Sequence, residues 1–188
     1  MQGIVPPFVG GDPTIQTNMS PYFTSMQAFA QRFGDTPERQ TIIEGLLDYR
    51  AALMAIGITG FQWLSGSFVE QVESIRGRPP GDVDVVSLIN RPAAISSDDK
   101  WLEFLGTENG NLLINPEGMK KAYRCDAYAI DLNEPGLDIA VVTSYWYGLF
   151  SHQRETSAWK GMVVVEINSE QDAEVRRSFT PAATPATV

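Results

Sequence analysis

The chain has 188 residues, enough for one domain, or at most two, with a substantial hydrophobic core. Hydrophobic residues make up 43% and charged residues 20% of the sequence, which excludes collagen-like, coiled-coil and wholly disordered proteins. Fourteen Lys and Arg against 23 Asp and Glu give a net charge of −9, which argues against extended nucleic-acid binding, because such binding needs many cationic contacts to phosphates.

The two ends of the sequence differ from its middle. Residues 1–25 are rich in Pro and Gly and are expected to form an arm without long regular elements. Residues 178–188 are small and contain prolines, so we expect a disordered tail there and a single domain over residues 26–177. The N-terminus lacks a signal-peptide pattern, and no apolar run reaches the ~20 residues of a membrane-spanning helix. We therefore expect a cytoplasmic protein without a membrane partner.

Apolar spacing predicts two helices and then several strands. The first helix covers residues 26–33 and is capped by Gly34, and the second starts at Thr36-Pro37 and ends by Gly57. Apolar and β-branched segments predict strands at residues 61–64, 83–89, 122–132 and 162–167, whereas residues 139–150 fit either a strand or a buried helix. This order of elements indicates an α+β protein.

The residue types available limit the kind of metal site. The single cysteine, Cys125, excludes an internal disulfide, and together with the single histidine, His152, it cannot form a usual thiolate and imidazole zinc site. A metal ion in this protein would be held by oxygen ligands, which suit Mg²⁺ or Mn²⁺.

Two aspartates open one of the most apolar segments of the chain. Asp82 and Asp84 flank Val83, and in an extended chain their side chains project to the same side about 6.5–7 Å apart. Bringing two like charges to ~7 Å costs roughly 2 kcal/mol at an effective dielectric constant of ~20. A divalent cation shared with substrate phosphates would remove this repulsion, although such a pair is also typical of a solvated strand end.

Gly66 and Ser67 complement the aspartates, because they follow a predicted strand. A glycine at this point lets a phosphate approach the backbone, and the Ser67 hydroxyl and nearby N–H groups can donate to phosphate oxygens. Taken alone, a Gly-Ser pair is commonly just a turn. Together with the aspartates it predicts a nucleotide site.

The Gly-Ser pair followed by the Asp-x-Asp pair resembles the signature of the DNA polymerase β-like nucleotidyltransferase superfamily. Over most of residues 4–167 the chain also looks like a bacterial family of small proteins of unknown function with this fold. The segments that carry this resemblance are Pro6-Pro7-Phe8, 29–33, Arg39, Gly57-Ile58, 66–69, 80–86, Phe150 and Lys160-Gly161. The resemblance implies a minimal nucleotidyltransferase fold, with a mixed sheet of about four to five strands and helices mainly on one face.

The resemblance also implies three carboxylates that act as metal ligands. Asp82 and Asp84 match the first two, and the third belongs on a later strand, where it also takes a proton from the acceptor hydroxyl. Asp126 is the first choice because it lies inside an apolar strand pattern, and Asp131, at the end of that strand, is the alternative.

Most of the cations near the aspartates in sequence are expected to be solvated surface residues, and one or two could neutralise a triphosphate. Lys160, between Trp159 and Gly161 at the start of a strand, is the first candidate and Arg154 the second. With Gly66 and Ser67, these two residues form the predicted nucleotide-binding set.

The resulting hypothesis is a metal-dependent nucleotidyltransferase. It would move a nucleoside monophosphate from an NTP to a hydroxyl of a protein, a small molecule or a tRNA, with Mg²⁺ or Mn²⁺ as cofactor. Comparable members of the superfamily suggest a role in a toxin–antitoxin or phage-defence pair. The alternative is a catalytically silent module of the same fold that binds a partner protein or senses nucleotides, and a third possibility is an unrelated structural α+β protein.

Overall fold

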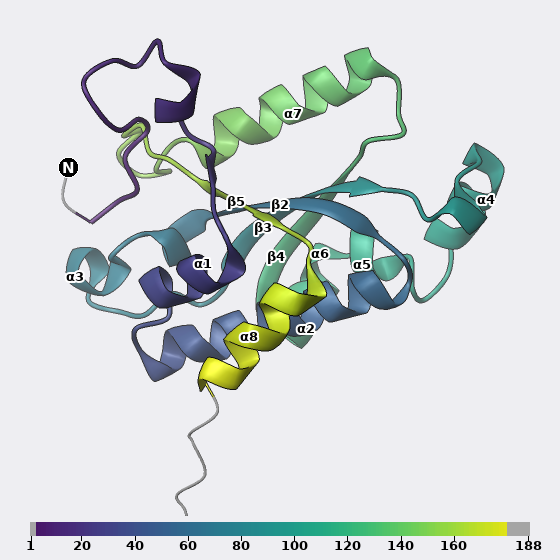
Figure 1. Ribbon diagram of the computed structural model, residues 1–188, viewed down its shortest axis with the longest axis horizontal. Helices are drawn as coiled ribbons and strands as arrows, with labels where there is room; N and C mark the ends of the chain where they lie inside the picture. Colours follow the sequence, from purple (N-terminus) through teal and green to yellow (C-terminus); the bar gives the residue numbers. More distant parts are fainter. Residues whose placement is uncertain (1–2, 180–188) are drawn as a thin grey trace, which may run out of the picture.

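A computed structural model describes residues 3–179 of the chain. Its centre is a five-stranded mixed sheet in the order β1-β5-β2-β3-β4 (Figure 1). The outer pairs, β1 with β5 and β3 with β4, are parallel, whereas β2 runs antiparallel to both β5 and β3. The strands are β1 (Tyr22–Phe23), β2 (Thr59–Ser65), β3 (Val83–Asn90), β4 (Cys125–Asp131) and β5 (Val163–Glu166). The expected α+β fold with a sheet of four to five strands is confirmed.

Helices cover the two faces of the sheet unequally. Most of them lie below the sheet in Figure 1, and α7 lies above it. The helices are α1 (Met26–Phe33), α2 (Pro37–Ala55), α3 (Val72–Arg76), α4 (Asp98–Leu105), α5 (Asn111–Ile114), α6 (Pro116–Tyr123), α7 (Gly136–Phe150) and α8 (Ser169–Phe179), with short 3₁₀ turns η1 (Gln16–Asn18), η2 (Gly66–Val69) and η3 (Ala93–Ile95). The expectation of helices mainly on one face therefore holds.

Two cores follow from this arrangement. The larger core joins α1, α2, α6 and α8 to one face of the sheet and contains Phe29, Leu46, Leu64, Val85 and Val175 among its buried residues. The smaller core lies between the other face and α7, where Trp63, Val86, Ile130 and Phe150 are buried. Alternate residues of β3 therefore enter different cores, as the two-residue period of a strand requires.

The ambiguous segment 139–150 is a helix. Its residues Val142, Trp146 and Phe150 recur every four positions and pack against the sheet, which is the spacing of one helix face. The strand expected from residue 122 begins at Cys125 instead, because α6 continues to Tyr123 and the next residue takes a left-handed conformation.

The two ends of the described chain are also structured. Within the expected N-terminal arm, β1 pairs with β5 and forms one edge of the sheet. At the other end, α8 continues through Ser178 and Phe179, so these two residues of the expected tail are helical. The remaining residues of the expected tail, 180–188, lie outside the described residues.

A buried ion pair anchors α8. The Arg50 side chain on α2 is completely buried, and its Nε donates to both carboxylate oxygens of Asp172 on α8 at 2.8 and 3.0 Å. Its other guanidinium nitrogens donate to Gln62 Oε1 at 2.9 Å and to the Glu166 carbonyl at 2.6 Å. One side chain therefore joins α2, α8 and the sheet.

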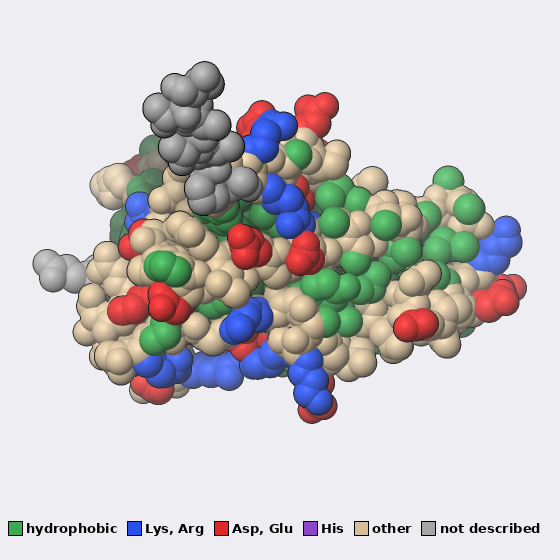
Figure 2. Space-filling view, turned by 90° about the horizontal axis from the view of Figure 1, so that it is seen from below, with side chains coloured by type: hydrophobic (Ala, Val, Ile, Leu, Met, Phe, Trp, Pro, Cys, Tyr) green, Lys and Arg blue, Asp and Glu red, His purple; other side chains and the backbone are tan. Residues whose placement is uncertain are grey.

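Charged side chains on the helical underside are mixed. Figure 2, which views this side from below, shows Lys and Arg interspersed with Asp and Glu, without one continuous basic surface on the visible face. Among residues 3–179, no helix is long and apolar enough to cross a membrane.

Candidate functional site

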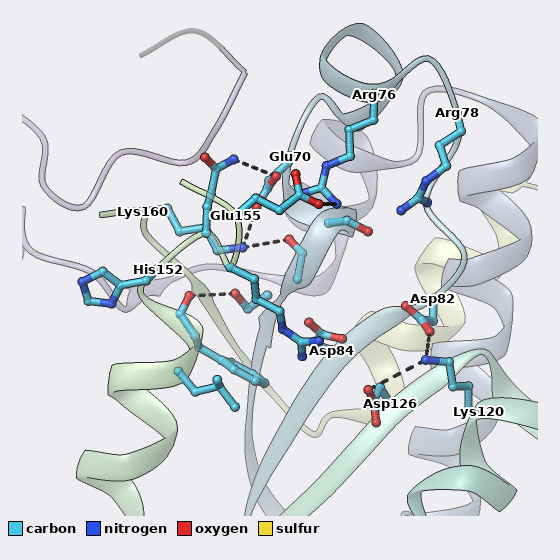
Figure 3. Close-up of a pocket in the computed structure, with 17 residues that line it drawn as sticks. Glu70, Arg76, Arg78, Asp82, Asp84, Lys120, Asp126, His152, Glu155 and Lys160 are labelled. Carbon is cyan, nitrogen blue, oxygen red and sulfur yellow. Dashed lines mark hydrogen bonds and ion pairs between the residues drawn. The ribbon is translucent and has the colours of Figure 1, made fainter. Parts of the chain in front are cut away.

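Three aspartates meet at one end of the sheet. Asp84 on β3 is the direct register partner of Asp126 on the parallel strand β4, so both side chains lie on the face that α7 covers. Asp82 precedes β3 by one residue and lies two positions from Asp84, on the same side. Figure 3 shows the three carboxylates together at this corner. We refer to Asp82, Asp84 and Asp126 as the acidic cluster.

The alternative third carboxylate, Asp131, lies elsewhere. It pairs in register with Ile89, at the far end of β3 and β4, about five residues or ~16 Å along the strand from Asp126. Its carboxylate accepts a 2.6 Å hydrogen bond from Arg91, which also pairs with Asp98 and Glu134. Asp131 is therefore part of a separate ion-pair network and not of the acidic cluster.

The Gly66-Ser67 turn lies directly beside the acidic cluster. β2 ends at Ser65, the register partner of Asp84, and η2 begins at the next residue. Gly66 has a φ of +75°, and a Cβ at this position would collide with the Asp84 carboxylate. Only a glycine allows this close approach of backbone and carboxylate.

This contact predicts the effect of adding one methyl group at the turn. Gly66→Ala should combine the left-handed backbone strain of about 1–2 kcal/mol with a steric penalty of about 1–3 kcal/mol from the Asp84 carboxylate. Gly77→Ala is the matched control, because Gly77 has a φ of +65° and open space around its Cβ position. Urea unfolding of both variants measures the difference. Equal loss of stability would show that the Asp84 contact is unimportant.

A buried ion pair supports the turn. Lys160 Nζ lies 2.7 Å from Glu70 Oε1 and donates to the Gly66 carbonyl at 3.0 Å, and both charged side chains are at most 4% exposed. Gln153 Nε2 donates to the second Glu70 oxygen at 2.9 Å. Lys160 thus lies at the predicted site, but its ammonium is engaged with Glu70 and the turn. Sequence reasoning missed Glu70, whose only signal was a charged residue in an otherwise apolar segment.

Three arginines also line the site. Arg76, at the end of α3, and Arg78 lie above the aspartates in Figure 3. Arg76 Nε is buried without a hydrogen-bond partner among the described residues, and Arg76 Nη1 lies 3.6 Å from Glu155. Arg154 comes from the loop between α7 and β5 and acts on Asp84 electrostatically. We call Arg76, Arg78 and Arg154 the arginine rim.

These groups enclose one cavity of about 300 Å³. Its lining contains every residue predicted for the site: Gly66, Ser67, Asp82, Asp84, Asp126, Arg154 and Lys160. It also contains Glu70, Arg76, Arg78, Lys120 and His152, which the predicted set did not include. The cavity is therefore lined by both carboxylates and guanidinium groups.

The electrostatics of Asp84 differ from those of an ordinary surface aspartate. Burial, and then the charges of Asp82 and Asp126, raise the pKa of Asp84 to about 6, while Arg154 and Lys160 act in the opposite direction. Among residues 3–179, no side chain or backbone N–H donates a hydrogen bond to its carboxylate. A partly buried carboxylate without such partners favours a proton or a cation.

The acidic cluster has the ligand types of a magnesium site, but its side chains are not in a metal-binding arrangement. Three carboxylates at adjacent positions supply the oxygen ligands that Mg²⁺ or Mn²⁺ prefers, and Asp84 has no competing hydrogen bond. Within the described part of the chain, however, no group of three or more Asp, Glu, His or Cys side chains is arranged to hold a metal ion. Lys120 Nζ instead lies 2.5 Å from Asp82 Oδ2 and 3.9 Å from Asp126 Oδ2.

Comparison with family models finds a match over most of the chain. The model of DUF6932, described as a family of unknown function, matches residues 1–166. No curated protein and no solved structure matches the chain.

Proposed function

Since the chain belongs to DUF6932, a family of unknown function, we propose its function from the geometry of the cavity. In this proposal the protein is a metal-dependent nucleotidyltransferase that moves a nucleoside monophosphate from an NTP to an acceptor hydroxyl, with Mg²⁺ or Mn²⁺ as cofactor. The observation that carries the proposal is the register of Asp84 with Asp126, which brings the acidic cluster to the Gly66-Ser67 turn.

The acidic cluster would hold the metal. Asp82, Asp84 and Asp126 supply carboxylate oxygens from two neighbouring strands. When bound, the metal ion would polarise the phosphate that undergoes substitution and neutralise its charge. Asp126 would also accept the proton of the acceptor hydroxyl, whose oxygen attacks the α-phosphorus as pyrophosphate leaves.

The turn and the arginine rim would hold the triphosphate. Backbone N–H groups at Gly66-Ser67 and the Ser67 hydroxyl can donate to the outer phosphates. Arg154, which acts on Asp84, and Arg76, whose Nε is unpartnered among the described residues, line the cavity, where guanidinium groups suit phosphate oxygens. Lys160 contributes by positioning the turn and not by direct contact, because Glu70 and the Gly66 carbonyl already engage its ammonium.

The net charge of the chain limits the choice of acceptor. A net charge of −9 disfavours a long nucleic acid, so a protein side chain, a small molecule or the end of a tRNA is the better acceptor. The resemblance to the nucleotidyltransferase superfamily adds a role in a toxin–antitoxin or phage-defence pair to the proposal.

One observation favours a second candidate, a catalytically silent module that binds a partner protein or senses nucleotides. The ion pair of Lys120 with Asp82 already neutralises part of the acidic cluster without a metal ion. In such a module, nucleotide would bind without any dependence on Mg²⁺, and no pyrophosphate would be released.

Asp84→Asn tests the proposed function. We expect the variant to lose Mg²⁺-dependent NTP binding and to release pyrophosphate at least about 100-fold more slowly, because one metal ligand is removed. Calorimetric titration with Mg-NTP and a pyrophosphate assay measure these effects. Asp131→Asn is the control, since Asp131 lies outside the cavity. Normal Mg-NTP binding by Asp84→Asn would contradict the assignment.

The same variant has a pH-dependent effect on stability without metal. Because the folded-state pKa of Asp84 is about 6 and its ordinary value is 3.8, the wild-type protein loses stability from this group as the pH rises between these values. The asparagine avoids this loss, so the variant should be about 1–3 kcal/mol more stable above pH 7 and equal to the wild type near pH 3.5. Urea unfolding in EDTA at the two pH values measures the gain. A gain in stability that does not depend on pH would show that the raised pKa of Asp84 is not its cause.

A further inference from the structure

Lys120 reaches the acidic cluster from the other side of the sheet. It lies in the last turn of α6, a helix of the larger core, and its ammonium extends to the corner where β3 and β4 begin. Figure 3 shows it between Asp82 and Asp126. The distances from Nζ are 2.5 Å to Asp82 Oδ2 and 3.9 Å to Asp126 Oδ2.

The geometry near Lys120 comes from the fold. The residue after α6, Arg124, adopts a left-handed conformation, with a φ of 54°, and donates its N–H to the Lys120 carbonyl at 3.1 Å. This sharp end turns the chain directly into β4, so that Lys120 and Asp126 lie only six residues apart on opposite sides of one turn. The backbone therefore brings the Lys120 side chain within reach of the acidic cluster.

The Lys120 side chain can also move away from the acidic cluster. It is 54% exposed, and its only ion pairs among the described residues are those with Asp82 and Asp126. An exposed ion pair of this kind is weak, and a lysine ammonium is strongly hydrated. By contrast, Lys160 and Glu70 form a buried ion pair beside the Gly66-Ser67 turn. Of these two cations near the aspartates, Lys120 is the one that can move without disturbing a buried contact.

A divalent cation and the Lys120 ammonium need the same oxygen atoms. An ammonium that donates to Asp82 Oδ2 occupies a lone pair that a metal would use, and it repels a metal held by Asp84 and Asp126. We propose that Lys120 is a displaceable counter-ion of the acidic cluster, which balances its charge in the metal-free protein and competes with the divalent cation. Lys120 thereby sets the affinity of the site for the metal. This inference rests on the proposed function, because it assumes that the acidic cluster binds a metal ion.

The test compares two adjacent lysines of α6. Lys120→Met removes the competing ammonium, and Lys121→Met removes the same charge from an exposed neighbour that does not line the cavity. Calorimetric titration of the full chain with Mn²⁺ alone should show about three- to tenfold tighter binding for Lys120→Met than for the wild type. Lys121→Met should stay within about twofold of the wild type, and the difference between the variants should shrink in high salt.

Thermal unfolding gives a readout that does not depend on activity. In EDTA, Lys120→Met should melt at a lower temperature than Lys121→Met, because the acidic cluster loses its counter-ion, and Mn²⁺ should reverse the order. Lys120→Gln, which keeps a hydrogen-bond donor without the charge, provides a second variant if Lys120→Met does not fold.

The outcomes separate this inference from the proposed function. If the wild type binds Mn²⁺ and the Lys120 variants bind it no more tightly than Lys121→Met, the inference is wrong and the proposed function stands. If none of the proteins binds Mn²⁺, both are wrong. If only the Lys120 variants bind Mn²⁺, Lys120 is a counter-ion strong enough to exclude the metal, and the wild type is the silent module.

Discussion

Replacing Asp172 by alanine is expected to lower the free energy of unfolding by about 3–5 kcal/mol, because it leaves the Arg50 guanidinium buried without its anion. Arg50 is completely buried, and Asp172 accepts both Nε contacts at 2.8–3.0 Å. The remaining acceptors, Gln62 Oε1 and the Glu166 carbonyl, carry no charge and cannot compensate for a buried cation. Urea unfolding followed by circular dichroism measures the loss.

The control for Asp172 is a second ion pair between the same two helices. Asp48 on α2 pairs with Arg176 on α8 at 2.7 Å, but these side chains are 59% and 42% exposed. Asp48→Ala should therefore cost less than about 1 kcal/mol. Similar losses for Asp48→Ala and Asp172→Ala would show that burial does not determine the strength of these contacts. In the double variant Arg50→Met/Asp172→Leu, much of the lost stability should return, since no buried charge remains.

Replacing Lys160 by methionine should have an effect of similar size on stability and a second effect on the site. The variant leaves Glu70 as a buried, unpaired carboxylate, which costs about 3–5 kcal/mol. It also removes the donor to the Gly66 carbonyl, so the turn beside Asp84 loses a support. We expect lower stability together with loss of NTP binding, measured by urea unfolding and by titration with Mg-NTP at a temperature where the variant is folded.

A double variant separates the two roles of Lys160. In Lys160→Met/Glu70→Gln the buried charges are both removed, so stability should largely recover, whereas the Gly66 carbonyl still lacks its donor and NTP binding should stay weak. Lys100→Met serves as the control, because this exposed lysine makes one weak contact to the Ala94 carbonyl at 3.3 Å. Full recovery of NTP binding in the double variant would mean that Lys160 does not position the turn.

Local patterns predicted two helices, α1 and α2, and four of the five strands, but not β1, α3, α4, α5 or α6. The apolar spacing of residues 26–33, the Thr36 cap and the β-branched run at 83–89 correctly predicted α1, the start of α2 and β3. Segment 139–150 stayed ambiguous because it is apolar on nearly every side, and only its packing onto the sheet shows a helix. Helix α8 was not predicted either, since it is mostly polar and its only buried residues are Asp172 and Val175.

For the candidate site, sequence reasoning identified residue types and the tertiary structure decided their partners. The close spacing of Asp82 and Asp84, and the glycine that ends β2, are visible along the chain because they depend on neighbouring residues. The choice of Asp126 over Asp131 depends on the register between β3 and β4, which is a contact between segments some forty residues apart. The sequence favoured Asp126 because it lies inside the apolar strand pattern, and the register places Asp126, not Asp131, beside Asp84.

The sequence by itself determined the first two helices, four strands, the two aspartates before an apolar strand and the glycine turn, because these follow from backbone preferences and from the two-residue period of a strand. Only the tertiary structure decided that Lys160 pairs with Glu70 and that Lys120 lies against Asp82. Charged side chains pair with groups that lie close in space, whatever their distance along the chain, and Lys160 and Glu70 are ninety positions apart. For this reason the chemical groups of the site could be predicted, whereas their ion pairs could not.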